Sequence, residues 1–408
     1  MLRFFDTSLI LFIYAGNIIM YTIFSILQNL LFIAIGVGGI SALVFIHEFG
    51  HYLFCKLFSI KTPSFSIGFG PRLYSKRMWD TDFVISAIPL GGYVEIAGLA
   101  EVGQGEQQEA FATGSYAFSE KPYYQKILTL LGGIIFNLLF AYIVFIGIHF
   151  FGAPAVPLLY IETATTRVAQ VQEGSPAEQA GIKEGDILES IDKIELNGTT
   201  TLNGSIESLA NLIKDSKHAY SEREKQVTLK IERNGSEQLV HVSIPDASTT
   251  CSPYLGIIFE QKAKPPVPLL QAIKKGIEST HRWIKRVALS YMQLFKKCDT
   301  SSMGGPIKII SMITQSANDG LLVFFLFLSI ISINLAVFNL IPVPILDGGQ
   351  IFIQTIETLA GRPLPLKVRE WIFAGTWIVF LILTVYLSFY DIKALISPYL
   401  TNIQQWFH

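Results

Sequence analysis

The chain has 408 residues, half of them hydrophobic and only 15% charged, and its formal net charge is −1. With a mean hydropathy of +0.44, this composition is typical of a membrane protein. The near-zero charge, with no Lys/Arg-rich run, argues against nucleic acid as a partner, and three widely separated cysteines form neither a CxxC pair nor a disulfide framework.

Charge-free apolar runs long enough to cross a bilayer of about 30 Å occur four times, at residues 7–46, 127–148, 321–346 and 371–390. The first run is too long for one span, and Gln28 and Asn29 interrupt it. We therefore expect a first span at 23–55 and treat residues 1–22 as an extra hydrophobic segment, with Met20 as an alternative start of the chain. A signal peptide fits poorly, because only Arg3 precedes the run. The other spans are expected at 127–151, 321–350 and 371–391.

The first span ends in "HEFGH", residues 47–51. His47 and His51 are four residues apart, so both imidazoles lie on one face of a helix, with Glu48 beside the first. In this pattern two histidines bind zinc and the glutamate serves as a general base. Histidines that simply hydrogen bond across a helix bundle would explain one of them, but not three polar residues at the end of a charge-free span.

The loop at residues 56–126 follows. Its segment 64–96 alternates apolar with polar residues and is rich in glycine, which predicts β-hairpins.

A soluble domain interrupts the membrane chain at residues 162–262, where charged residues and glycine-containing turns replace the apolar runs. Its string "VAQVQEGSPAEQAGIKEGDILESIDKIELNG" (168–198) resembles the core of PDZ domains, which bind extended peptides by adding a strand to a sheet edge. The segment "YLGI" (254–257) is the candidate loop for a peptide terminus; the alternative is a PDZ fold that only filters substrates by size. The amphipathic segment 265–300 after it is expected at the membrane interface.

A third metal ligand is offered by "NLIPVPILDGGQ", residues 339–350. Asp347 ends the third apolar run, and Pro342 and Pro344 prevent a regular helix there. Broken backbone at membrane depth is tolerated only where it is buried in protein or lines a wet cavity. Alone, Asp347 could be an ordinary helix-end residue, but with the two histidines it completes three ligands and leaves one open position.

Several motifs occur together around the inserted domain: "HEFGH", "GFGPRL" (68–73), "AIPLGGYV" (87–94), "LLGGIIFN" (130–137), "SMGGPI" (302–307) and "SINLAVFNLIPVPILDGG" (332–349). In this order they resemble the site-2 protease family of intramembrane zinc metalloproteases, of the bacterial regulator of sigma-E protease (RseP) type, over about residues 30–395. Two departures are visible. The insert has room for one PDZ domain rather than a tandem pair, and "LGGIIFN" lacks the more usual Gly-Pro before its asparagine.

The resemblance implies Zn2+ held by His47, His51 and Asp347, with Glu48 as the catalytic general base. It also implies substrate-binding roles for Asn334 and Asn339, as clamps on the substrate backbone, and for Asn137 near the zinc. The alternative for these three amides is hydrogen bonding between membrane helices. The implied fold is an α-helical polytopic membrane protein, with a membrane-associated β-region that pairs with the substrate strand and an inserted mixed α/β PDZ domain.

The implied activity is that of an intramembrane zinc metalloendopeptidase, which cleaves single-pass membrane proteins within or near their spans. The family acts in regulated intramembrane proteolysis, so the expected substrates are anti-sigma factors or remnant signal peptides. The other expected partners are the lipid bilayer and, at the PDZ domain, peptide termini.

Basic residues near the spans predict the orientation. Seven of them crowd the loop between the first and second spans: Lys56, Lys61, Arg72, Lys76, Arg77, Lys121 and Lys126. We therefore expect that loop and the zinc site on the cytoplasmic side of a bacterial inner membrane, and the PDZ domain outside the cytoplasm.

Two functions from other classes compete with proteolysis. One is a non-catalytic scaffold that presents a PDZ domain and uses zinc as a structural clip, but such a site has no use for Glu48. The other is a transporter, which would be expected to show repeated halves with paired broken helices, and the sequence shows no repeat.

Overall fold

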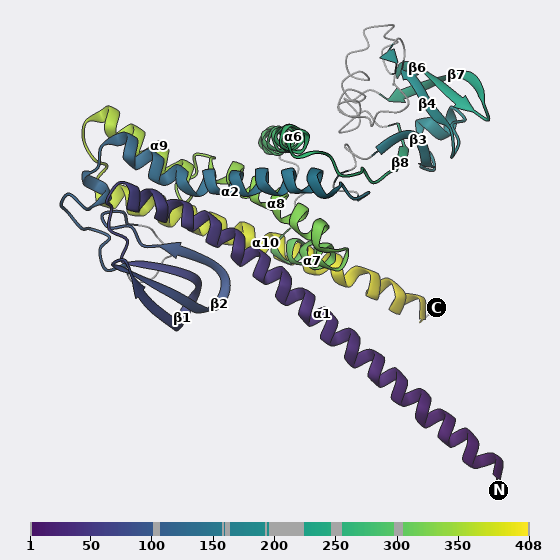
Figure 1. Ribbon diagram of the computed structural model, residues 1–408, viewed down its shortest axis with the longest axis horizontal. Helices are drawn as coiled ribbons and strands as arrows, with labels where there is room; N and C mark the ends of the chain where they lie inside the picture. The colour runs from purple at the N-terminus through teal and green to yellow at the C-terminus, as the bar shows by residue number, and fades with distance from the viewer. Residues whose placement is uncertain are drawn as a thin grey trace. The chain divides into compact units, whose positions relative to one another are not determined.

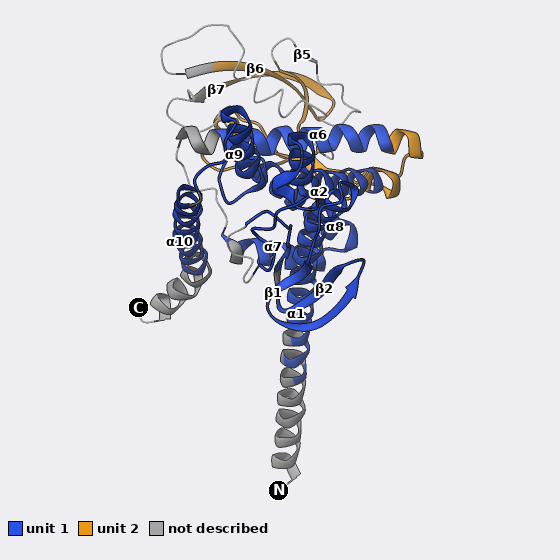
Figure 2. Cartoon of the chain, turned by 90° about the vertical axis from the view of Figure 1, so that its left-hand side faces the viewer, with its two compact units in different colours: residues 1–147, 273–408 blue, residues 148–272 orange. Residues whose placement is uncertain are grey.

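In this computed structural model the described residues are 2–100, 107–156, 159, 164–191, 194–195, 224–245, 255–297 and 305–406. They form two compact units, residues 1–147 with 273–408 (unit 1) and residues 148–272 (unit 2), which Figure 2 shows in blue and orange. Within the described part, four helices are long and apolar enough to cross a membrane: Leu30–Leu57, Tyr123–Phe151, Leu321–Asn339 and Lys367–Lys393. Their number matches the four spans expected from the sequence.

Helix α1 (Leu2–Leu57) begins unit 1 and continues through Gln28 and Asn29 without a break. It ends in a left-handed cap, because Ser59 has a φ of 53° and the Ile60 N–H donates to the Cys55 carbonyl, the closure typical of a Schellman motif. This fixed ending places the HEFGH stretch in the last turns of a regular helix.

Strands β1 (Ser64–Met78) and β2 (Thr81–Val94) form one antiparallel hairpin that folds back on itself. Phe65 pairs both with Phe83 and with Val94, so the start of β1 lies between the two ends of β2. The fold-back needs glycine at residue 68, where φ is +88° and a Cβ would lie 2.6 Å from the Ile88 carbonyl oxygen. Figure 1 shows the hairpin alongside the last turns of α1. Where the sequence predicts β-hairpins within 64–96, the structure has this one folded-back hairpin.

A hydrophobic core joins the hairpin to α1 and to α2 (Tyr123–Phe151). A short 3-10 helix, η1 (Phe118–Glu120), contributes the buried ring of Phe118 to this core. The buried members of this core are Tyr52, Cys55, Ile60, Phe65, Val94, Ile96, Leu99, Phe118 and Leu130. Because it includes residues from α1, from the end of β2 and from α2, this core sets the position of the strand end beside the HEFGH helix.

The rest of unit 1 contains α7 (Pro306–Asn318), α8 (Leu321–Asn339), α9 (Asp347–Ala360) and α10 (Leu366–Trp406). Residues 340–346 between α8 and α9 are not helical, as Pro342 and Pro344 predict. Asp347 is the first residue of α9. The expected proline-broken acidic loop is thus a short connection that ends at the candidate ligand.

Helix α10 is joined to its neighbours by polar contacts near both ends of its apolar span. At one end, Arg369 donates to the Gln350 side chain on α9. At the other, the buried Asp391 carboxylate accepts from the backbone N–H groups of Gly305 and Lys308 at the start of α7. A carboxylate at a helix N-terminus is favourable because the orphan N–H groups there point at it.

Unit 2 is built on a sheet with the strand order β7-β6-β4-β3-β8, and β5 pairs beside β4. The strands are β3 (Ala164–Val171), β4 (Ile187–Ile191), β5 (Ile194–Glu195), β6 (Glu224–Arg233), β7 (Ser236–Pro245) and β8 (Ile257–Gln261). The short helix α4 (Pro176–Gln179) starts at Ser175, whose hydroxyl accepts from the Glu178 N–H. Within the PDZ-like string, strand β3, a turn, helix α4 and strand β4 follow one another over residues 168–191. Residues 196–223 and 246–254, with part of the predicted "YLGI" loop, lie outside the described residues.

Helix α6 (Leu269–Lys297) begins at the end of unit 2, belongs to unit 1 from Ile273 onward, and packs through small residues. The side chains of Ala272, Ser279 and Thr280 are buried, whereas Leu270 and Ile273 are exposed. At Gly276 a Cβ would lie 2.7 Å from the Ile146 backbone on α2, so the two helices cross closely. The exposed apolar residues are compatible with the interfacial position expected from the sequence.

A buried ion pair supports unit 2. The Asp186 carboxylate accepts two hydrogen bonds from Arg233, at 2.7 and 2.6 Å, and one from the Lys183 N–H at 2.8 Å. Burial alone would raise the pKa of Asp186, but the hydrogen bonds and positive charge of Arg233 outweigh it, and the pKa lies below its usual value. A carboxyl with a lowered folded-state pKa stabilises the fold above its unfolded pKa, and this stabilisation is lost as the pH falls toward the folded value.

We therefore predict that Asp186→Asn destabilises unit 2 by about 2–3 kcal/mol at pH 7. The difference from wild type should shrink as the pH falls below the usual aspartate pKa of about 4, because the carboxyl is then protonated in the unfolded state first and, at still lower pH, in the folded state as well. Hydrogen exchange of the β4 and β6 amides in the full-length protein measures this. A difference that does not change between pH 7 and pH 3 would contradict the assignment.

Candidate active site

The two histidines of the HEFGH stretch are buried in unit 1 and aimed at one point. His47 and His51 are 7% and 6% exposed, and their Nε2 atoms lie 3.2 Å apart. His51 is fixed from behind, because its Nδ1 lies 2.8 Å from the Thr129 carbonyl oxygen on α2. Both Nε2 atoms are therefore presented toward the same small volume.

Asp347 reaches this volume from the start of α9. Its Oδ2 lies 3.2 Å from the Nε2 of His47 and its Oδ1 lies 3.6 Å from the Nε2 of His51. A tetrahedral zinc ion with bonds of about 2.0–2.2 Å separates its ligand atoms by roughly 3.3–3.6 Å. Each histidine Nε2 thus lies at about the separation that zinc requires from the other Nε2 and from one oxygen of the Asp347 carboxylate. The buried Oδ2 of Asp347 has no hydrogen-bond partner among the described residues. These residues fit a zinc ion with three protein ligands.

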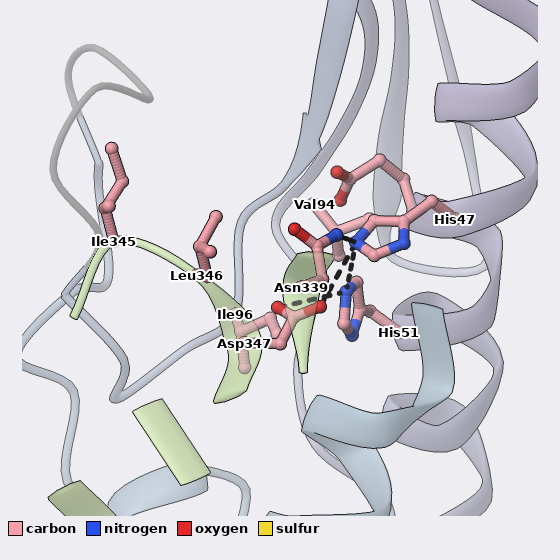
Figure 3. Close-up of a pocket in the computed structure, with 9 residues that line it drawn as sticks. His47, His51, Val94, Ile96, Asn339, Ile345, Leu346 and Asp347 are labelled. Carbon is pink, nitrogen blue, oxygen red and sulfur yellow. Dashed lines mark hydrogen bonds and ion pairs between the residues drawn. The ribbon is translucent and has the colours of Figure 1, made fainter. Parts of the chain in front are cut away.

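Glu48 belongs to the same cavity but not to the donor set. The cavity has a volume of about 160 Å³ and is lined by His47, Glu48, His51, Val94, Ile96, Asn339, Ile345, Leu346 and Asp347. Val94, at the end of β2, lines the same cavity, so this strand end lies beside Glu48 and the ligands. In Figure 3, Ile345 and Leu346 lie along the chain that leads into Asp347, away from His47. An anionic side chain next to an open ligand position is placed to move protons.

The three asparagines predicted from the sequence are not all brought together. The Asn137 amide lies 3.1 Å from the Nδ1 of His47, and the Asn339 amide lies 3.3 Å from its Nε2, the latter shown in Figure 3. Asn334 instead donates to the Ile330 carbonyl of its own helix, at 2.8 Å, and does not line the cavity. A clamp role for Asn334 would require its side chain to leave that hydrogen bond.

Glycines on the facing helices bring α1 and α2 into contact. A Cβ at Gly132 would lie 2.6 Å from the Gly50 carbonyl oxygen. A Cβ at Gly133 would lie 2.6 Å from the Nδ1 of His47 and 2.6 Å from the Nε2 of His51. Reasoning from the sequence did not assign these glycines, nor Thr129, to the site. The adjacent glycines within an apolar helix were the signal that could have found them, because such residues mark close helix approach in membranes.

Comparisons with known proteins agree with this geometry. The family model for peptidase family M50 matches residues 35–383. A chain of Clostridium perfringens, named as a candidate zinc metalloprotease, is 30% identical over 383 residues, covering 93% of this chain and all of the relative. A Nostoc chain and a Helicobacter pylori chain with names of the same kind are 30% and 27% identical, covering 86% and 83% of this chain and 93% of each relative. The chain therefore belongs to peptidase family M50, the site-2 protease family of zinc metalloproteases, and His47, His51 and Asp347 form its candidate zinc site.

Proposed function

We propose that this protease cleaves single-pass membrane proteins within or near their membrane span. The observation that carries the proposal is the position of the donor set. His47 and His51 are buried in a helix whose apolar stretch, Leu30–Leu57, is long enough to cross a bilayer. Ionisable groups at such a position are energetically costly, and by default they mark a functional site. A protease of soluble substrates has no need of a catalytic cluster on a membrane helix.

The side chains divide the reaction between them. Zinc, when bound, polarises the scissile carbonyl and activates water. Glu48 accepts the proton of the attacking water and passes it to the leaving amine. Asn339, whose amide lies 3.3 Å from the Nε2 of His47, is placed to donate to a substrate carbonyl that enters the cavity.

A membrane helix must be unwound before hydrolysis, because its carbonyls are held in the i→i+4 ladder. The end of β2 and the residues just after it can supply replacement hydrogen bonds to the substrate backbone. Val94 and Ile96 line the cavity, and this strand end pairs with β1 on one side. We infer that an extended substrate segment adds to this strand end and so keeps its backbone groups hydrogen-bonded while the bond is cut.

Unit 2 is the part of the protein that we propose selects substrates. Its strand order and its resemblance to PDZ domains support a PDZ-like module, and β8 stands at the end of the described sheet, where a peptide strand can be added. We propose that this module lies outside the cytoplasm and excludes substrates with bulky outer domains. The corresponding substrates are trimmed anti-sigma factors or signal-peptide remnants in a bacterial inner membrane.

Reconstitution in liposomes tests the function. Two substrates would share one span containing helix-breaking residues and differ only in a folded outer domain. The wild-type chain is expected to cut the trimmed substrate, with new ends that mass spectrometry maps within or next to the span, and to spare the untrimmed one. Cleavage confined to soluble loops would contradict intramembrane proteolysis. Equal cleavage of both substrates would contradict only the filter. A scaffold would cut neither.

A further inference from the structure

The side of His47 opposite the donor cluster faces α2. Its Nε2 points at Asp347 and His51, whereas its Nδ1 lies 3.1 Å from the Asn137 side-chain amide. Asn137 is completely buried, and the other end of its amide, Oδ1, has no hydrogen-bond partner among the residues that the structure describes. The resemblance gave this asparagine a role toward substrate, but it lies behind the ligand and does not line the cavity.

The chemistry of a histidine ligand determines what Asn137 must present. A neutral imidazole that binds a metal through Nε2 carries its proton on Nδ1, so Nδ1 is then a donor that needs an acceptor. The two ends of a side-chain amide have the same shape, and the surrounding network decides which end faces a partner. With the amide oxygen toward His47, the Nδ1–H gains its acceptor. The turn costs no hydrogen bond at the far end, since Oδ1 accepts none there.

We propose that Asn137 is a positioning residue for the metal ligand: its side-chain oxygen accepts from the Nδ1–H of His47 and so fixes the tautomer that presents Nε2 to zinc. The Thr129 carbonyl does the same for His51, at 2.8 Å, eight residues earlier on the same helix. α2 is itself tied to α8, because the Ser332 hydroxyl donates to the Asn137 carbonyl at 2.9 Å. Both histidines are therefore oriented by one helix that holds no ligand of its own.

The proposal rests on the metal site and not on the identity of the substrate, so binding of zinc alone tests it. The full-length protein in detergent would be stripped of metal and titrated with zinc against a competing chelator. Asn137→Leu, similar in size but without an acceptor, should weaken zinc binding roughly 10–100-fold. Asn137→Asp keeps an acceptor and should bind zinc at least as tightly as wild type. Absorption spectra of the Co2+-loaded proteins report whether the donor geometry changes in the same order.

Two controls fix the scale of the titration. Asp347→Ala removes a ligand and should lose zinc most strongly. Asn334→Leu removes an amide that donates to the Ile330 carbonyl of its own helix and should bind zinc as wild type does, whatever its effect on substrate.

Each outcome decides for or against the proposal. Weak binding by Asn137→Leu together with tight binding by Asn137→Asp supports it. Wild-type affinity in Asn137→Leu overturns it and would assign the Nδ1 proton to the nearby Gly133 backbone. Equal losses in both variants also overturn it, since a merely structural amide, or one that donates, would not be rescued by aspartate. If Asn137→Leu fails to fold, the affinity of Asn137→Asp alone decides, and a loss there refutes the acceptor role.

Discussion

Replacing Glu48 by Gln is expected to lower turnover by about two to four orders of magnitude while leaving the zinc content unchanged. Removing a group that transfers protons costs roughly that much. Glu48 lines the cavity but is not part of the donor set formed by His47, His51 and Asp347. The substitution also preserves the shape of the side chain, so the cavity lining beside Val94 is unchanged. The variant should therefore bind and retain a substrate without cutting it.

Cleavage by gel mobility, zinc by elemental analysis and substrate retention by pull-down measure these three properties on the same liposome preparation. Asp347→Ala is the matched control, because it should lose both zinc and cleavage. Equal turnover by wild type and Glu48→Gln would remove the general-base role. Loss of zinc in Glu48→Gln would make Glu48 a ligand and require the roles to be reassigned.

Local pattern was sufficient to predict the ligands. The four-residue spacing of His47 and His51 fixes their common helical face, and the two prolines before Asp347 fix the break from which it enters the cavity. Each of these features depends on a few neighbouring residues and on the bilayer's intolerance of unpaired polar groups. The structure brings the two Nε2 atoms and the Asp347 carboxylate together at separations close to those that zinc requires.

Long-range placement could not be predicted in the same way. Asn334 and Asn339 are both amides on α8, five residues apart, yet only Asn339 reaches His47. Five residues are about 500° of helical rotation, so the two amides point in directions roughly 140° apart, and which one faces the site depends on how α8 is rotated against α1. Packing decides that rotation, and packing is not visible in a single sequence. The doubled pairing of Phe65 with two parts of β2 is invisible for the same reason.

Helix α2 carries no metal ligand, yet it positions both histidine ligands. α2 supplies the Thr129 carbonyl to one histidine and the Asn137 amide to the other, and both contacts depend on how closely it lies against α1. Glycine permits that short distance, since a Cβ at Gly133 would lie 2.6 Å from a nitrogen of each imidazole. We therefore predict a large loss of zinc affinity when a side chain is added at Gly133.

Replacing Gly133 by Ala is expected to reduce zinc affinity by more than about 100-fold and to abolish cleavage. The added Cβ would lie 2.6 Å from the Nε2 of His51 and from the Nδ1 of His47, far inside van der Waals contact at roughly 3.5–4.0 Å. Relief requires either that α2 move away, which breaks the Thr129 and Asn137 contacts, or that the imidazoles turn, which separates their Nε2 atoms. Both responses dismantle the donor set.

Gly147→Ala on the same helix is the matched control, because a Cβ there meets nothing within 4 Å, and it should retain wild-type zinc affinity. The chelator titration and the thermal unfolding of both variants measure the contrast, and wild-type zinc binding by Gly133→Ala would show that α2 does not set the ligand geometry.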